Sequence, residues 1–383
     1  MLFRSRASYG VLGSTNYNSD GLVANYYYKS LYGIGKIYDQ FTSFNNTVEA
    51  IQIGNPDITF QKSKEFNAGV DFSLLNNALR GSVGGFLNNF TGSIVNLFDV
   101  TPGVAGGSAS LMYDNLKSYR SYGAEAEISF TKRFGELELN VGGNFTWSRS
   151  MATKEFDVDY PDNLSGLRKV TLDGDLKGYR VVGKFADQAD IDASPVQALG
   201  GKVYPGDLKY EDRNGDGYVN EADMVVIANT TPSLQYGLDI SLKFKGFNVD
   251  VLGYGLAGFD TMLTNKYYQI FGDRKYSNVI NTGLPNGKKH PMLHADATNN
   301  NFQNSDYWVA DGGFFKIRNV ELGYTLPGAL TSKLSVNNVK LFVRGTNLFT
   351  LSQIDDLDPE YIDGGISNYP LMRTFTGGVS FSF

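Results

Sequence analysis

Cysteine is absent from the 383 residues, and histidine occurs only twice. The absence of cysteine excludes disulfides, thiolate metal sites and a cysteine nucleophile. The net charge is -6, and no cluster of Lys or Arg stands out, which argues against nucleic acid as a partner because phosphates attract a concentrated positive surface. No apolar run reaches about 18 residues, so we expect no transmembrane helix. If the chain crosses a membrane, it must do so with strands.

Alternation of apolar and polar residues is the dominant pattern. In "ELELNVGGNFTWS" (136–148), leucines and aromatic residues fall on one face and mainly polar residues on the other, as in a strand with two different faces. The same split recurs in 66–74 and in 236–251, where Lys245 and Gly246 predict a hairpin turn. The final segment, "RTFTGGVSFSF", alternates up to its last residue.

Many such strands, joined by polar turns or long loops, are typical of an outer-membrane β-barrel. A soluble β-sandwich or propeller also alternates and is the alternative. The 24 Tyr and 26 Phe favour the barrel, because aromatic residues gather at membrane interfaces. Tight connections such as "FKGF" contrast with long polar ones at about 151–231 and 260–310, which predicts short periplasmic turns and long extracellular loops.

An ordered series of motifs carries a family resemblance. The series runs through "RASYGVLG", "GNPDITFQKSKEFNAGVDFSLLNNALRGSV", "DNLKSYRSYGAEAEISF", "GDLKYEDRNGDGYVNEAD", "DYWVADGGFFKIRNVELGYTLP", "RGTNLF" and "YPLMRTFTGGVSFSF". In this order the motifs resemble the C-terminal portion of the SusC/RagA-type TonB-dependent outer-membrane transporters of Bacteroidetes. The resemblance covers nearly the whole chain.

The resemblance implies an all-β fold in which residues 1–383 form the C-terminal part of a transmembrane antiparallel β-barrel, surrounded by outer-membrane lipid. The intact family has 22 strands around a plug. It also implies active uptake of oligosaccharides (glycans) or peptides, energised by TonB and assisted by a SusD-like surface lipoprotein, and no enzymatic activity. Phe381 and Phe383, in the last strand, are the expected C-terminal signal for the barrel assembly machinery.

Several parts of the family pattern have no counterpart in residues 1–383. These are the signal peptide, the TonB box, the plug and the first barrel strands, and "MLFRSRASYG" lacks the apolar run of an export signal. We therefore expect a fragment with roughly half of a barrel's strands and two unpaired edges. Two other functions stay open: a passive porin-like barrel, and a secreted calcium-dependent module of the dockerin type.

The stretch "DRNGDGYVNEAD" (212–223) has the register of an EF-type calcium loop, with Gly217 at the sixth position. We expect a structural Ca²⁺ site within 207–225, inserted in a long extracellular loop. Asp223 stands where Glu is usual, and its shorter side chain favours weaker binding. The alternative is an acidic turn without metal. The predicted ligands are Asp212, Asn214, Asp216, the carbonyl of Tyr218, Asn220 through water, and Asp223.

Two enzyme-like patterns carry less weight. "GYGLAG" (253–258) matches a dinucleotide fingerprint, with Asp273 at a suitable distance, but the preceding strand alternates, whereas a Rossmann strand is buried on both faces. Its glycines are better explained by close packing in a barrel wall. His290 and His294 have the spacing of zinc ligands on a helix, but Pro291 lies between them. Catalysis is not supported.

Aromatic residues in the long loops are candidates for stacking on a ligand or packing against a lid protein. For each of them, a place in the loop core or at the membrane interface is the alternative. The group consists of Tyr267, Tyr268, Phe271, Tyr276, Phe302, Tyr307 and Trp308.

Overall fold

The computed structural model describes most of the chain. The described residues are 2–14, 27–38, 44–97, 113–154, 172–264, 267–268, 291–292, 300–331, 336–362, 369 and 371–382. Within them, no helix is both long and apolar enough to cross a membrane.

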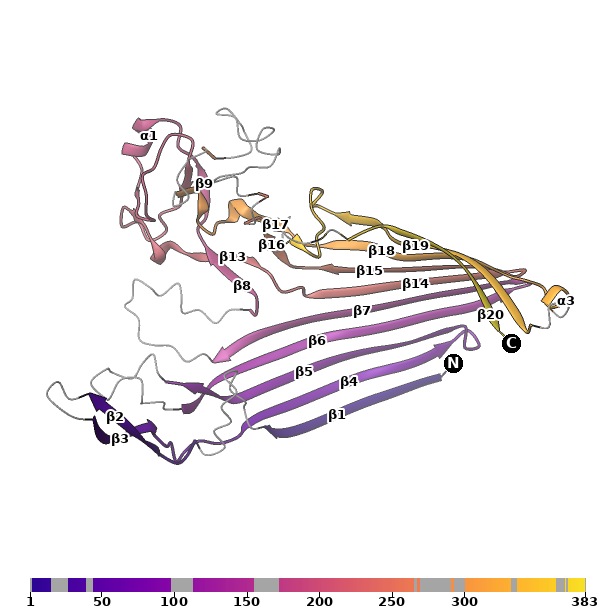
Figure 1. Cartoon of the computed structure of the whole chain (residues 1–383), viewed down its shortest axis with the longest axis horizontal. Coiled ribbons are helices and arrows are strands. Elements are labelled where there is room, and N and C mark those ends of the chain that lie inside the picture. Colours follow the sequence, from indigo (N-terminus) through magenta and orange to yellow (C-terminus); the bar gives the residue numbers. More distant parts are fainter. Residues whose placement is uncertain are drawn as a thin grey trace.

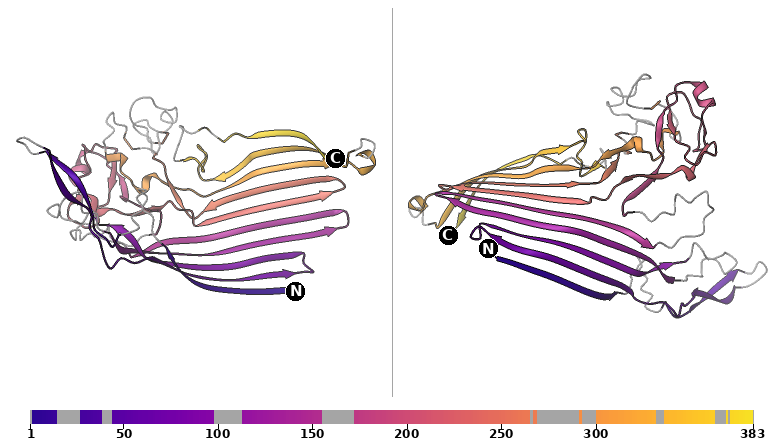
Figure 2. Two further views of the ribbon diagram at one scale, coloured as in Figure 1. Left: turned by 60° about the horizontal axis from the view of Figure 1, so that its bottom comes forward. Right: turned by 180° about the vertical axis from the view of Figure 1, so that it is seen from behind.

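A single antiparallel sheet of ten strands makes up the wall of the molecule. Its strands lie side by side in chain order, as Figure 2 shows. They are β1 (Leu2–Ser14), β4 (Gln61–Leu74), β5 (Leu79–Asn96), β6 (Tyr113–Phe134), β7 (Leu137–Lys154), β14 (Leu234–Phe244), β15 (Phe247–Ala257), β18 (Phe314–Thr325), β19 (Asn338–Ser352) and β20 (Thr374–Ser382). Within this sheet β1 and β20 are the two edges, as expected from the sequence.

The register of the strands gives the wall one apolar and one polar face. Ile240 of β14 pairs with Val141 of β7 and with Val251 of β15. The next residue, Ser241, pairs with polar residues on both neighbouring strands. Because successive side chains point to opposite faces, the alternation predicted from the sequence becomes two continuous surfaces. We call them the apolar face and the polar face.

Glycines in the wall make room for aromatic rings on the neighbouring strand. A Cβ atom at Gly253 would lie 2.5 Å from the ring of Phe315, and one at Gly255 would lie 2.5 Å from the ring of Tyr236. The rings of Tyr236 and Phe315 stack at 5.9 Å. All of "GYGLAG" except Gly258 therefore belongs to the antiparallel strand β15, with close side-chain packing as predicted, and the motif is not a nucleotide-binding turn.

The two ends of the wall differ in their connections (Figure 1). At one end, short turns lie at 75–78, 135–136 and 245–246, together with a slightly longer link that contains α3 (Gly328–Thr331). At the other end, five long connections span 15–60, 97–112, 155–233, 258–313 and 353–373. This confirms the predicted contrast, although β7 extends to Lys154 and so takes in the first residues of the expected loop.

The long connections contain small elements of their own. The first holds the hairpin of β2 (Leu31–Tyr38) and β3 (Phe44–Gln52). The others are β8 (Asp175–Gly178), β9 (Val181–Lys184), α1 (Gln188–Asp192), β10 (Val196–Gln197), β11 (Leu208–Tyr210), β12 (Tyr218–Val219), η5 (Glu221–Asp223), β13 (Val225–Asn229), β16 (Asp260–Met262), η6 (Asn300–Phe302), η7 (Asp306–Trp308) and β17 (Val309–Asp311).

Candidate functional site

The two longest connections fold together beyond the end of the wall (Figure 1). We call this unit the loop module, made of the described parts of 172–231 and 291–311. It has a hydrophobic core of its own, to which both connections contribute. The buried core residues are Tyr179, Leu208, Tyr210 and Val219, and Val181, Leu199, Met224 and Tyr307 pack against them.

Burial raises the pKa of the tyrosines in this core. Desolvation, followed by the negative charges of Glu221 and Asp223, raises the pKa of Tyr179 to about 12. Desolvation alone raises the pKa of Tyr307 to about 12, and the pKa of Tyr210 is raised mainly for the same reason. These hydroxyls are therefore neutral throughout the physiological range.

Two buried asparagines join the connections to each other. The side chain of Asn301 accepts a hydrogen bond from the N–H of Leu208 at 2.8 Å and donates one to the carboxylate of Asp207 at 2.8 Å. The side chain of Asn300 donates to the carbonyl of Leu208 at 2.6 Å, and the hydroxyl of Tyr210 donates to the carbonyl of Asn300 at 2.8 Å. Because an unpaired buried polar group costs about 1–3 kcal/mol, these bonds fix how the connections meet.

Asn229, at the end of β13, links the loop module to the wall. Its side chain donates to Asp175 of β8 at 2.7 Å, and its backbone N–H donates to Asp260 of β16 at 2.9 Å. The guanidinium of Arg149 in β7 donates to the Asn229 side-chain oxygen at 3.3 Å. One residue thus contacts the bases of both connections and a strand of the wall.

The acidic loop of the predicted calcium site lies on the loop module between β11 and β13. The carboxylate of Asp212 accepts the N–H groups of Gly215 at 2.8 Å and Gly217 at 2.9 Å. Both glycines have positive φ, 73° and 85°, which other residues adopt only with strain. Asp216 accepts the N–H of Tyr218 at 2.8 Å. At the third position, the side-chain oxygen of Asn214 accepts the N–H of Asp216 at 2.9 Å.

Asp223 closes the loop at its twelfth position. Its carboxylate is 1% exposed and accepts the N–H groups of Arg213 at 2.8 Å, Asn214 at 3.3 Å and Asn220 at 2.9 Å. The side chain of Asn220 in turn caps η5. The two ends of the loop are therefore joined through one buried carboxylate.

The residues of this loop match calcium ligands in residue type and in their spacing along the sequence. A carboxylate has about four acceptor positions, and the bonds above, with one from Asn214 to Asp216, leave each aspartate some capacity for a cation. In the described part of the chain, no three His, Cys, Asp or Glu side chains are gathered as a metal site. The three predicted carboxylates, Asp212, Asp216 and Asp223, are thus not gathered around one point, and each accepts backbone N–H groups of the loop instead. Calcium stays a prediction.

The loop aromatics occupy different environments. Trp308 is buried at 2% exposure and donates its indole N–H to the carbonyl of Asn301 at 3.0 Å, which is the loop-core alternative for this residue. Tyr307 lies edge-on to Trp308, with ring centroids 5.0 Å apart, and packs against the same core. Tyr267 and Tyr268 form a second edge-to-face pair at 5.0 Å.

Some predicted residues cannot be placed. Phe271, Tyr276, Asp273, His290, His294 and Phe383 lie outside the described residues. Phe381 is in β20, pairs with Val339 and is exposed on the apolar face. Its predicted part in barrel assembly stays a prediction.

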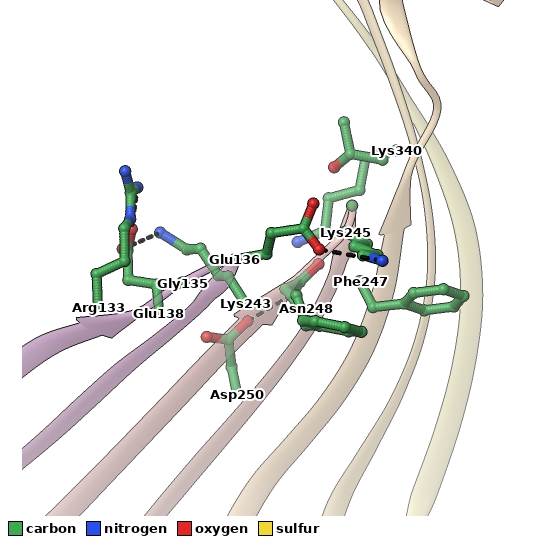
Figure 3. A pocket seen from close by; sticks show the side chains of 13 residues that line it. Arg133, Gly135, Glu136, Glu138, Lys243, Lys245, Phe247, Asn248, Asp250 and Lys340 are labelled. Atoms are coloured by element: carbon green, nitrogen blue, oxygen red, sulfur yellow. Dashed lines mark hydrogen bonds and ion pairs between the residues drawn. The ribbon is translucent and has the colours of Figure 1, made fainter.

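Charged residues line the polar face near the short turns (Figure 3). The guanidinium of Arg133 lies 2.9 Å from the carboxylate of Glu138, and the ammonium of Lys243 lies 3.5 Å from the same side chain. Lys245 pairs with Glu136 at 3.0 Å. These side chains border a cavity of about 610 Å³. The alternation in the sequence predicts that these positions are polar, but it does not predict which side chains pair. The pairs form because the register of three strands brings the charged side chains together.

A wall with an apolar and a polar face, short turns at one end and long connections at the other is the wall of a transmembrane β-barrel. The chain belongs to the TonB dependent receptor-like, beta-barrel family, whose model matches residues 6–348. It is an outer-membrane protein of a receptor family and not an enzyme.

Two curated TonB-dependent receptors are similar to this chain in sequence. TonB-dependent receptor SusC of Bacteroides thetaiotaomicron is 24% identical over 401 residues, which cover 99% of this chain and 37% of SusC. TonB-dependent receptor P3 of Formosa agariphila is 24% identical over 413 residues, which cover 99% of this chain and 39% of P3. The chain thus spans well under half of these curated relatives.

Among solved structures, the RagAB peptide importer in its open-open state matches the fold with a TM-score of 0.70. The sequence identity is 19%, and the match covers 100% of this chain and 40% of that chain. The likeness shows the fold of the wall and its loops.

Proposed function

We propose that this chain forms part of the wall of an active importer that takes up oligosaccharides or peptides across the outer membrane. TonB energises the importer, and a SusD-like lipoprotein delivers the substrate. The observation that carries the proposal is the family match over 6–348 on a wall whose two longest connections form a loop module with its own core. Such a body suits contact with a partner better than the mobile loops of a passive pore.

Uptake experiments test this proposal. The gene that encodes the complete receptor is deleted, and uptake of labelled oligosaccharides and of labelled peptides is measured in parallel, with and without TonB. We expect uptake of one class to require both the receptor and TonB. Uptake that needs the receptor but continues without TonB would support the passive porin instead. If the deletion reduces uptake of neither oligosaccharides nor peptides, the importer proposal is wrong.

We also propose that the acidic loop binds Ca²⁺ as a structural clip on the loop module. The support is the residue register, the two positive-φ glycines and the buried carboxylate of Asp223. A cation there would offset the charges of Asp212 and Asp216, which lie in one short loop. The flanking elements β11 and β13 are strands, whereas calcium sensors open pairs of helices, so a structural role is favoured over a regulatory one.

A calcium titration by calorimetry tests the clip. The complete receptor is compared with the variant Asp212→Ala/Asp216→Ala, and Asp187→Ala/Asp192→Ala is the control because these aspartates lie at α1 on the same module. We expect calcium binding to be lost only in the first variant, while assembly of the barrel is unchanged. Absence of binding at millimolar calcium in the unmodified receptor would exclude the site.

A further inference from the structure

A buried lysine in β18 holds the connection between β19 and β20. The side chain of Lys316 is 2% exposed and lies at the end of the wall that bears the long connections. Its ammonium contacts the carboxylate of Asp358 and lies 2.6 Å from a carboxylate oxygen of Glu360. A buried charge is stable only when it is paired, so the ammonium requires these two acidic residues, which lie some forty positions later in the chain.

The opposite end of the same connection is held by Asn347. The guanidinium of Arg318 lies 3.5 Å from Glu360 and donates to the side-chain oxygen of Asn347 at 3.0 Å. The side-chain N–H of Asn347 donates to the carbonyl of Met372 at 3.1 Å. Asn347 has a positive φ of 53°, a conformation that asparagine adopts more readily than most residues. Two strands of the wall thus hold both ends of one connection.

Packing beneath this segment is uneven. Ile354, Pro359 and Ile362 are buried and anchor the outgoing part of the connection. Between them, Asp355, Asp356 and Leu357 border a cavity of about 390 Å³ that Lys316 also lines. The segment therefore rests on three buried apolar residues and a charged contact, with a cavity beside Asp355, Asp356 and Leu357.

We propose that Lys316, Arg318, Asn347, Asp358 and Glu360 form a polar clasp that keeps residues 353–362 folded against the wall as a flap at the outer end of the barrel. Lys316 controls the position of the flap because its ammonium contacts both acidic residues. When the clasp opens, the flap leaves the wall and widens the outer mouth. The clasp is a property of the folded wall and does not depend on which substrate the barrel carries.

Hydrogen exchange of the complete receptor, followed by mass spectrometry, tests the clasp. In Lys316→Met the amides of 353–362 should exchange about tenfold faster or more, because removing one partner of a buried ion pair leaves uncompensated charge. The control is Lys340→Met, which removes a 2.6 Å pair with Glu321 between the same two strands but at their other end. This control should leave exchange of 353–362 unchanged.

Asn347→Gly supplies a second variant that keeps the backbone unstrained at positive φ. It should accelerate exchange around Met372 while the strands of the wall stay protected, so it tests the clasp even if Lys316→Met does not assemble. Faster exchange confined to residues 353–362 and to the region around Met372 supports the proposal. Unchanged exchange in both variants, or equal acceleration in Lys340→Met, would overturn it.

Discussion

Asn301 lies where the two long connections meet, and its side chain is fully buried. We expect Asn301→Ala to destabilise the loop module by about 2–4 kcal/mol, because the N–H of Leu208 and the carboxylate of Asp207 would each lose a partner. Limited proteolysis in urea measures the effect. Asn304→Ala is the control, since Asn304 is exposed. Equal stability of the two variants would contradict the role given to Asn301.

The tyrosines of the module predict its response to alkaline pH. Tyr307 and Tyr179 have pKa values of about 12 in the folded state, above the ordinary value of about 10. Unfolded tyrosine therefore ionises first, and the stability that these groups contribute is intact below pH 10 and is lost as pH rises toward 12. We expect the module to open in that window while the wall stays folded. Tyrosine absorbance at 295 nm, recorded alongside proteolysis, measures this.

The acidic loop and the clasp show what a sequence reveals about single residues. All the predicted ligands lie within 212–223, so their spacing can be checked against a known loop without any tertiary information. Lys316 and Glu360 belong to separate elements, and no local pattern relates them. Only the pairing of β18 with β19 and the return of the chain bring them together. A local spacing can therefore be recognised in the sequence, whereas contacts between distant segments cannot.

Two short turns, at Gly135 and Gly246, allow a matched comparison at the scale of the element. Both glycines have positive φ, but a Cβ atom at Gly135 would meet open space, whereas one at Gly246 would lie 2.8 Å from the carbonyl oxygen of Thr325. We expect Gly135→Ala to cost about 1 kcal/mol from backbone strain alone and Gly246→Ala to cost clearly more. Unfolding in urea, followed by loss of heat-modifiable migration, ranks the two. Equal losses would show that the contact at Thr325 relaxes freely.

Strands of the wall were predictable where apolar and polar residues alternate, because each strand has nine residues or more, which is long enough for the period to be recognised. The ladders of the loop module were not. β10 and β12 have two residues each, and β9 and β11 have four and three. Such segments carry no period, and they form because the surrounding core of tyrosine and leucine positions them.

At the scale of the whole molecule, the two faces of the wall predict opposite responses to a new charge. Ile240 lies on the apolar face among valines, and Ser241 lies on the polar face beside Asn140 and Asp250. We expect Ile240→Arg to destabilise the receptor by about 2–4 kcal/mol in a bilayer and Ser241→Arg to be nearly neutral. Unfolding from lipid vesicles compares them. A larger loss at Ser241 would mean that the faces are assigned the wrong way round.

The placement of every long connection at one end of the wall also bears on how such proteins diverge. Three hairpins are set in register by a short turn at the opposite end, so a long connection can gain or lose residues without shifting their strands. Selection can thus remodel the outward side, and an engineer can insert an epitope or a recognition sequence there, while the part that must fold in the bilayer is left alone. The parts that can vary and the parts needed for assembly thus lie at different positions along the same strands.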